Sequence, residues 1–165
     1  MSPLVTAYIG LGGNVGDPAD TLRAAFRSID GLPGTRVTAT SGLYRTPAWG
    51  REEQPDFINA VACVATHLPA QELLAGLLDV ERAFGRHRDR AQGRWGPRVL
   101  DLDLLLYGDD VIDEPGLRVP HPHLHERAFV LVPLVEVAPG LTIPGIGRAD
   151  AALASMASDG IQALP

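Results

Sequence analysis

The stretch that organises this chain runs from Arg94 to Tyr107 and reads RWGPRVLDLDLLLY. Its second half has the apolar content of a buried strand, yet it contains two carboxylates, Asp101 and Asp103. Successive side chains of a strand point to opposite faces of a sheet, so the two aspartates share one face. The alternate leucines are expected on the other face, where they supply a core: Leu100, Leu102, Leu104 and Leu106.

The paired aspartates predict a site for a divalent cation. Two like charges two residues apart repel each other and are costly to half-bury. A magnesium ion bound by one or two carboxylates and by phosphate oxygens would remove that cost. The alternative is a strand whose aspartate face is exposed to water, and an isolated Asp-x-Asp pattern does not exclude it.

Arginine is concentrated next to this strand. All 14 basic residues of the chain are arginine, and Arg82, Arg86, Arg88, Arg90, Arg94 and Arg98 lie close together, although the net charge is −6. Guanidinium groups bind phosphate in a forked geometry and stay protonated. The local cluster therefore favours a phosphate-bearing ligand, whereas the acidic overall charge disfavours nucleic acid and anionic membranes. The alternative is a solvated arginine loop.

Composition excludes several other chemistries. Without lysine the chain has no Walker-type phosphate loop, Schiff base or pyridoxal-phosphate anchor. The single Cys63 forms no internal disulfide and is expected to be a buried, inert thiol. Neither a signal peptide nor a membrane-spanning run is recognisable. With 45% hydrophobic residues, we expect residues 1–165 to form one soluble, cytoplasmic, monomeric domain.

The hydrophobic periodicity predicts an α+β fold with a ferredoxin-like βαββαβ core and an antiparallel sheet. A C-terminal hairpin, Val111–Ile112 with Leu117–Val119, and short helices at 127–135 and 149–156 extend this core, and the last helix is expected on the open sheet face. The core elements are expected as strands Thr6–Gly12, Arg36–Leu43 and Phe57–Thr66, a helix from the Asp17 cap to Gly31, a helix between Pro69 and Gly85, and the aspartate strand.

Two long loops, 44–56 and 85–97, are predicted to be functional. Four aromatic residues at these loops and at a later helix would sandwich a flat ring: Trp49, Phe57, Trp95 and Phe129. For Phe129, packing in the core is the alternative. His121, His123 and His125 suggest zinc, but their spacing matches no closed site and cysteine partners are missing. One histidine at the entrance of a phosphate site is the preferred interpretation.

Four ordered motifs resemble those of the 6-hydroxymethyl-7,8-dihydropterin pyrophosphokinase family, over about residues 5–144. They are Tyr44-Arg45-Thr46-Pro47, Gln54 to Ala60, Arg94 to Asp103, and Val119-Pro120-His121 with Arg127-Ala128-Phe129. The resemblance implies a folate-pathway enzyme that transfers the terminal diphosphate of ATP to the hydroxymethyl group of the pterin and releases AMP. The implied reaction requires no nucleophile from the protein.

The resemblance also implies residue roles. Asp101 and Asp103 match the carboxylates that hold two Mg²⁺ ions on ATP, and Arg86 and Arg98 match the catalytic arginines. Residues matching the pterin-binding positions are Thr46, Pro47, Phe57, Asn59, Trp95 and Phe129. Those matching the ATP-binding positions are Leu74, Glu81, Arg88, Arg98, Leu104, Arg118, His121 and Arg127. The chain departs from the family pattern at Gly13, Leu78 and Pro122, of which the last two bear on nucleotide affinity.

Two other functions are compatible with parts of the pattern. A ferredoxin-like RNA-binding module would use stacking aromatic residues among basic ones, but the acidic charge and the strand aspartates argue against it. A nucleotidyltransferase with the same Asp101–Asp103 pair would release free pyrophosphate instead of AMP. The identity of the products therefore distinguishes these enzymes.

Overall fold

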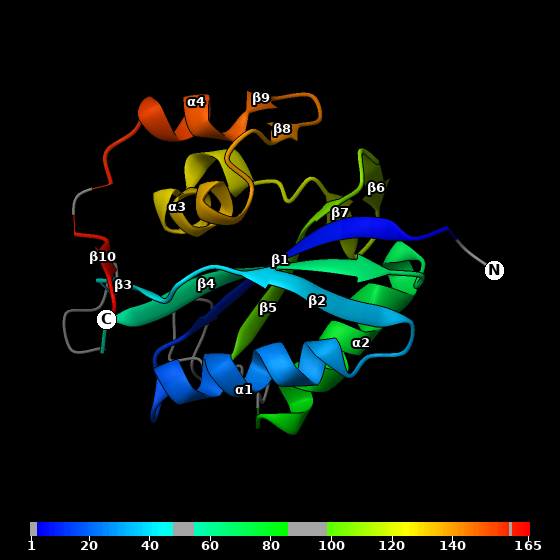
Figure 1. Ribbon diagram of the computed structural model, residues 1–165, viewed down its shortest axis with the longest axis horizontal. Coiled ribbons are helices and arrows are strands. Elements are labelled where there is room, and N and C mark those ends of the chain that lie inside the picture. Colours follow the sequence, from blue (N-terminus) through cyan, green and yellow to red (C-terminus); the bar gives the residue numbers. More distant parts are fainter. Residues whose placement is uncertain (1–2, 48–54, 86–98, 159) are drawn as a thin grey trace.

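The computed structural model describes residues 3–47, 55–85, 99–158 and 160–165. A central antiparallel sheet has α1 and α2 on one side and α3 and α4 on the other (Figure 1). This arrangement confirms the predicted α+β class. The elements in chain order are β1 (Val5–Gly13), α1 (Pro18–Asp30), β2 (Thr35–Thr40), β3 (Tyr44–Thr46), β4 (Phe57–Thr66), α2 (Ala70–Ala83), β5 (Asp101–Tyr107), β6 (Ile112–Glu114), β7 (Leu117–Val119), a 3-10 helix (Leu124–Glu126), α3 (Ala128–Val137), β8 (Thr142–Ile143), β9 (Gly147–Arg148), α4 (Ala149–Ala154) and β10 (Gln162–Ala163).

The strand order of the large sheet is β10-β3-β4-β1-β5, and β2 also pairs with β4. Its β2-β4-β1-β5 part has the predicted ferredoxin-like arrangement. The strand expected at 36–43 ends earlier, at Thr40, and β3 lies in the segment that was predicted as the loop 44–56. Strands β2 and β3 pair with opposite halves of β4. The predicted β6–β7 hairpin is confirmed. Sequence analysis did not find β10, which pairs with β3 at the edge of the sheet.

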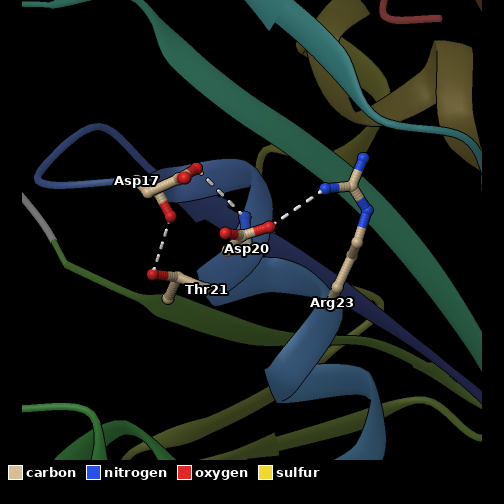
Figure 2. Close-up of polar contacts among 4 residues, drawn as sticks. All are labelled: Asp17, Asp20, Thr21 and Arg23. Atoms are coloured by element: carbon tan, nitrogen blue, oxygen red, sulfur yellow. Dashed lines mark hydrogen bonds and ion pairs between the residues drawn. The ribbon is translucent and has the colours of Figure 1, made fainter.

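Helix α1 illustrates how local sequence sets an element's boundaries. The Asp17 side chain accepts a hydrogen bond from the backbone N–H of Asp20 at 3.3 Å, and the Thr21 hydroxyl donates to the Asp17 carbonyl at 3.0 Å (Figure 2). Asp20 also pairs with Arg23 at 3.3 Å (Figure 2). Pro18 lies in the first turn, and these contacts provide hydrogen-bond partners for polar groups at the start of the helix. The predicted cap is therefore confirmed.

An apolar core fills the space between the sheet and α1 and α2. Alternate residues of β1, β4 and β5 meet one side of each helix, as strand and helix periodicities require. Its fully buried or nearly buried members include Ala7, Ile9, Leu11, Leu22, Ile29, Ala62, Leu73, Leu77, Leu100, Leu102 and Leu104.

A register shift in β5 interrupts the alternation of leucines. Tyr8 pairs with Leu106 and Ile9 with Leu104, so Leu105 is an extra residue on β5. Beyond this bulge, Leu106 packs with the cluster between the sheet and α3, and Tyr107 joins the core between the sheet and α1 and α2. The prediction that Leu106 shares a face with the preceding leucines is wrong, because the bulge inverts the pattern.

The second layer differs from expectation in one respect. Helix α3 packs on β4, whereas α4 lies on α3 (Figure 1), so the prediction that residues 149–156 pack on the open sheet face is wrong. Cys63 is half-buried beside its cross-strand partner Tyr8, not fully buried as expected. In the part of the chain that the structure describes, no helix combines the length and apolar character needed to cross a bilayer.

Candidate active site

Strand register brings the predicted site residues to one end of the α3-facing side of the sheet. Tyr44, Asn59, Gly12 and Asp101 are successive cross-strand partners on β3, β4, β1 and β5. Directly opposed residues in paired strands point to the same face. Asn59 and Asp101 therefore lie on the same side, roughly 10 Å apart for strands about 4.8 Å apart. Asp103 belongs to the next row, opposite Gly10.

Two glycines form the floor between the polar groups. A Cβ atom at Gly12 would lie 2.9 Å from Oδ1 of Asn59, and one at Gly10 would lie 3.4 Å from the Leu105 side chain. Glycine at position 12 thus leaves the space that the Asn59 amide occupies. Sequence analysis did not identify this role, although two glycines at alternate positions of a strand indicate a close approach by another group.

A buried polar pair lies on the β3–β4 side of this floor. Asn59 and Thr46 are 8% and 4% exposed, and Nδ2 of Asn59 donates to Oγ1 of Thr46 at 3.4 Å. The half-buried Phe57 is the cross-strand partner of Thr46, whereas Pro47 is exposed where β3 ends. An amide beside a hydroxyl provides both donors and acceptors, as recognition of a heterocycle edge requires.

Asn14 supports the same end of the sheet. It is 1% exposed, and its Nδ2 donates to the Pro55 carbonyl at 3.2 Å, which ties the end of β1 to the chain entering β4. Sequence analysis did not identify this role of Asn14. A buried side chain bonding across 41 positions of sequence becomes visible only in the fold.

A pocket of about 400 Å³ lies at the β5 edge of the sheet. It brings together Asp103 and the predicted nucleotide contacts Leu74, Leu104, Arg118 and His121. The pocket combines an apolar wall with charged and polar side chains, which is typical of small-molecule sites. The remaining lining residues are Leu102, Gly116, Leu117 and Pro122.

His121 is held beside Asp103. Its backbone N–H donates to the Leu105 carbonyl at 3.0 Å, and its Nδ1 accepts from the His123 backbone at 3.2 Å. Burial lowers the pKa of His121; the Asp103 charge opposes this shift, and Arg127 and His123 add to it. The imidazole is consequently neutral near pH 7.

The predicted contacts Glu81 and Arg127 do not line the pocket. Glu81 is 3% exposed, and its carboxylate accepts the Leu102 backbone N–H at 2.7 Å, between the two aspartates. The Arg127 guanidinium carbon lies 5.7 Å from the centre of the Phe129 ring. Phe129 is half-buried in the first turn of α3.

The described residues fit magnesium better than zinc. Within them, no group of three or more His, Cys, Asp or Glu side chains is placed to hold a metal, and His123 pairs with Glu126 at 3.1 Å. Two half-buried carboxylates on one face suit an ion that takes its other ligands from phosphate and water. Four predicted site residues and one aromatic residue lie outside the described residues: Arg86, Arg88, Trp95, Arg98 and Trp49.

Comparison with known families identifies the chain. The model of the 7,8-dihydro-6-hydroxymethylpterin-pyrophosphokinase family matches residues 8–139. The chain belongs to this family. Pyrophosphokinase relatives include the 2-amino-4-hydroxy-6-hydroxymethyldihydropteridine pyrophosphokinases of Pseudomonas aeruginosa, 43% identical over 96% of both chains, and of Methylorubrum extorquens, 46% identical over 86% of this chain and 88% of that one. The resemblance predicted from the motifs is confirmed.

Solved structures support the pyrophosphokinase fold. The crystal structure of wild-type Plasmodium falciparum HPPK-DHPS with pteroate superposes with a TM-score of 0.72 at 12% identity, covering 94% of this chain and 43% of that chain. A second crystal structure of wild-type Plasmodium falciparum HPPK-DHPS gives a TM-score of 0.70 at 13% identity, covering 93% of this chain and 41% of that chain. This chain thus spans less than half of those longer proteins, and at such identity the similarity concerns the fold alone.

Proposed function

We propose that this chain transfers the pyrophosphoryl group of ATP to the hydroxymethyl group of 6-hydroxymethyl-7,8-dihydropterin, releasing AMP, with the pterin bound at the polar end of the α3-facing side of the sheet and ATP at the adjoining β5 edge. The activity itself, in folate synthesis, follows from family membership and agrees with the sequence prediction. One observation carries the placement of the substrates. Asn59 and Asp101 lie in one row of cross-strand partners and face the same side of the sheet, and Gly12 is the residue between them in that row.

The pterin is assigned to the Asn59 end of this row. The buried Asn59 amide and the Thr46 hydroxyl would hydrogen-bond the edge of the ring, and Phe57 and Phe129 would stack on its faces. The sheet supplies the first three of these groups, and α3 supplies Phe129. Pro47 and Trp95 are assigned to the same end on the family resemblance alone.

The nucleotide is assigned to the pocket at the β5 edge. Leu74, Leu102 and Leu104 give it an apolar wall, and Arg118 and His121 would bind phosphate oxygens near Asp103. A neutral His121 would donate one hydrogen bond without adding a charge. Arg127 would neutralise phosphate charge near His121, and its positive charge contributes to lowering the pKa of that imidazole.

Asp101 and Asp103 would hold two Mg²⁺ ions with the nucleotide. Magnesium held there would supply positive charge that offsets the negative charge of the phosphate groups. Glu81 fixes the backbone between the two aspartates through the Leu102 N–H. Arg86 and Arg98 are proposed as cations that assist transfer, and Arg88 as a further ATP contact. These three roles rest on the family resemblance.

The contribution of the protein to the reaction is then mainly positioning. The pterin hydroxyl attacks the β-phosphorus in line with the leaving AMP oxygen, and no side chain forms a covalent intermediate. Binding the two substrates at opposite ends of the Asn59–Gly12–Asp101 row would orient the hydroxyl toward the phosphates. A cytoplasmic location, a monomeric state and a single domain over residues 1–165 remain predictions.

Product analysis tests the reaction. The protein is incubated with Mg-ATP and the pterin alcohol, and nucleotides and pterins are separated by chromatography. We expect AMP and the pterin diphosphate in equal amounts, and neither without the pterin alcohol. ADP as the nucleotide product would indicate phosphoryl transfer, and free pyrophosphate would indicate nucleotidyl transfer; either result would overturn the proposal.

Paired variants test the assignment of substrates. Asn59→Ala is expected to raise KM for the pterin by about tenfold to a hundredfold and leave KM for ATP nearly unchanged, because a buried hydrogen-bonding group is lost. Arg118→Ala should do the opposite. Equal effects on both constants from either variant would contradict the placement.

A further inference from the structure

Glu136 joins the end of α3 to the chain entering β3. Its carboxylate oxygens accept the Gly42 backbone N–H at 3.1 and 3.0 Å, and Oε1 accepts the Tyr44 hydroxyl at 2.5 Å. Burial, followed by this hydrogen bond, raises the pKa of Tyr44 to about 12, so the hydroxyl remains a donor at neutral pH. One carboxylate thus receives two donors from the segment that leads to Thr46.

This contact connects the two elements assigned to the pterin. Tyr44 is the cross-strand partner of Asn59 and lies two residues before Thr46, so all three face α3. In α3, Phe129 and Glu136 are seven residues apart, which is about two helical turns. Both side chains therefore project from the same side of the helix.

The remaining contacts of α3 with the sheet are mainly apolar. They involve a cluster that includes Val61, Leu105, Leu131 and Leu134. Apolar packing is non-directional, so it holds the helix on the sheet without strictly fixing its rotation or its sliding. Hydrogen bonds from both Gly42 and Tyr44 to Glu136 are directional and oppose such movements at the β3 side.

We propose that Tyr44 and Glu136 are positioning residues for the pterin: their hydrogen bond fixes α3 relative to β3 and thereby holds the Phe129 ring opposite Thr46 and Asn59. Neither side chain needs to touch the substrate. The inference rests on the proposed function, because it assumes that the pterin binds between Phe129 and the Thr46–Asn59 pair. It predicts that losing the contact weakens pterin binding selectively.

Steady-state kinetics of Tyr44→Phe and Glu136→Ala test this role. Each is expected to raise KM for the pterin roughly fivefold to twentyfold, while kcat and KM for ATP change less than about twofold. Glu136→Gln keeps an acceptor oxygen for the Tyr44 hydroxyl and should recover most of the pterin affinity. Unchanged pterin KM in Tyr44→Phe and Glu136→Ala, or equal increases in both KM values, would overturn the inference.

Asp30 provides a matched control on the opposite layer. Its carboxylate, at the end of α1, accepts the Val37 backbone N–H of β2 at 2.8 Å, so it also joins a helix end to a strand. Asp30→Ala should lower the unfolding temperature to a similar extent as Glu136→Ala but leave pterin KM unchanged. An increase in pterin KM in this control would show that general loosening, not positioning, explains the effect.

The Asn59→Ala variant separates the two proposals. If Asn59→Ala raises pterin KM and the Tyr44 and Glu136 variants do not, only the positioning role fails. If Asn59→Ala also leaves pterin KM unchanged, the pterin site itself is misplaced, and the inference fails with it.

Discussion

The two faces of the central sheet use the same strands in different ways. Toward α1 and α2, residues such as Ile9, Leu11 and Leu102 continue an apolar core from one end of the strands to the other. Toward α3, one end of the sheet is apolar, with Val61 and Leu105, while the other end carries buried or half-buried polar groups. One face provides stability throughout, and the other divides its length between stability and ligand binding.

Two local features make this division possible. Gly10 and Gly12 remove side chains from β1 between the polar residues of β4 and β5. Leu105 follows Asp103 on the face toward α3, and the bulge at Leu105 turns Leu106 toward α3 as well. The polar end therefore changes to an apolar end within two residues of a single strand.

Removing both charges from the polar end should have the largest effect. The double substitution Asp101→Asn and Asp103→Asn is expected to lower magnesium-dependent kcat/KM by about a thousandfold or more, because the proposed cation ligands are lost. Asp109→Asn, in the exposed turn after β5, is the control and should retain full activity. Product formation is measured over a range of magnesium concentrations, and circular dichroism checks the fold. Near-normal turnover of the double variant would refute the mechanism.

Core truncations test whether the two faces differ in function as well as in composition. Leu77→Ala, below the sheet in α2, and Leu134→Ala, above it in α3, should each cost about 2–5 kcal/mol of unfolding free energy, since both side chains are 0% exposed. Only Leu134→Ala is expected to raise pterin KM as well, because α3 carries Phe129. Urea unfolding and kinetics below the transition provide the comparison. An equal KM for the pterin in the two variants would contradict the proposal that the two faces of the sheet differ in function.

The glycine floor gives a smaller, more local test. Gly12→Ala places a methyl group 2.9 Å from Oδ1 of Asn59, so the amide must move, and pterin KM should rise about tenfold. Gly10→Ala contacts only the Leu105 side chain at 3.4 Å and should leave pterin KM within about threefold. Both variants are expected to fold. A larger pterin defect in Gly10→Ala than in Gly12→Ala would show that the Asn59 amide is not the critical group.

The smallest expected effect concerns pH. Because the pKa of Tyr44 is raised to about 12 in the folded protein, its contribution to stability is fully present below pH 10 and is lost as pH rises through about 12. Tyr44→Phe should therefore lose less stability than the parent protein over this range. Phenolate formation is followed spectroscopically in both proteins as the pH is raised. The variant is needed for comparison because Tyr8 and Tyr107 also have raised pKa values. The difference between the two curves reports the titration of Tyr44 alone, and a midpoint of that difference near pH 10 would contradict the Tyr44–Glu136 contact.

Elements whose signals are local could be predicted from the order of amino acids. The Asp17 cap, the periodic leucines of α2 and the alternation in β4 each depend on neighbours a few residues away, and all were predicted close to their observed positions. The motif from Arg94 to Asp103 likewise identified the family, because that pattern is contiguous. The location of Asp101 and Asp103 on the same face of the sheet followed directly from strand geometry.

Features that depend on the register between distant strands became visible in the folded protein alone. Four features join segments far apart in sequence: the bulge at Leu105, the pairing of β10 with β3, the Gly12 floor under Asn59, and the hydrogen bond from Tyr44 to Glu136. A shift of one residue would send every side chain of a strand to the other face, and local propensities carry no information about such a shift. The pattern of single strands thus supplied the functional groups, whereas their assembly into one site depends on how the strands align.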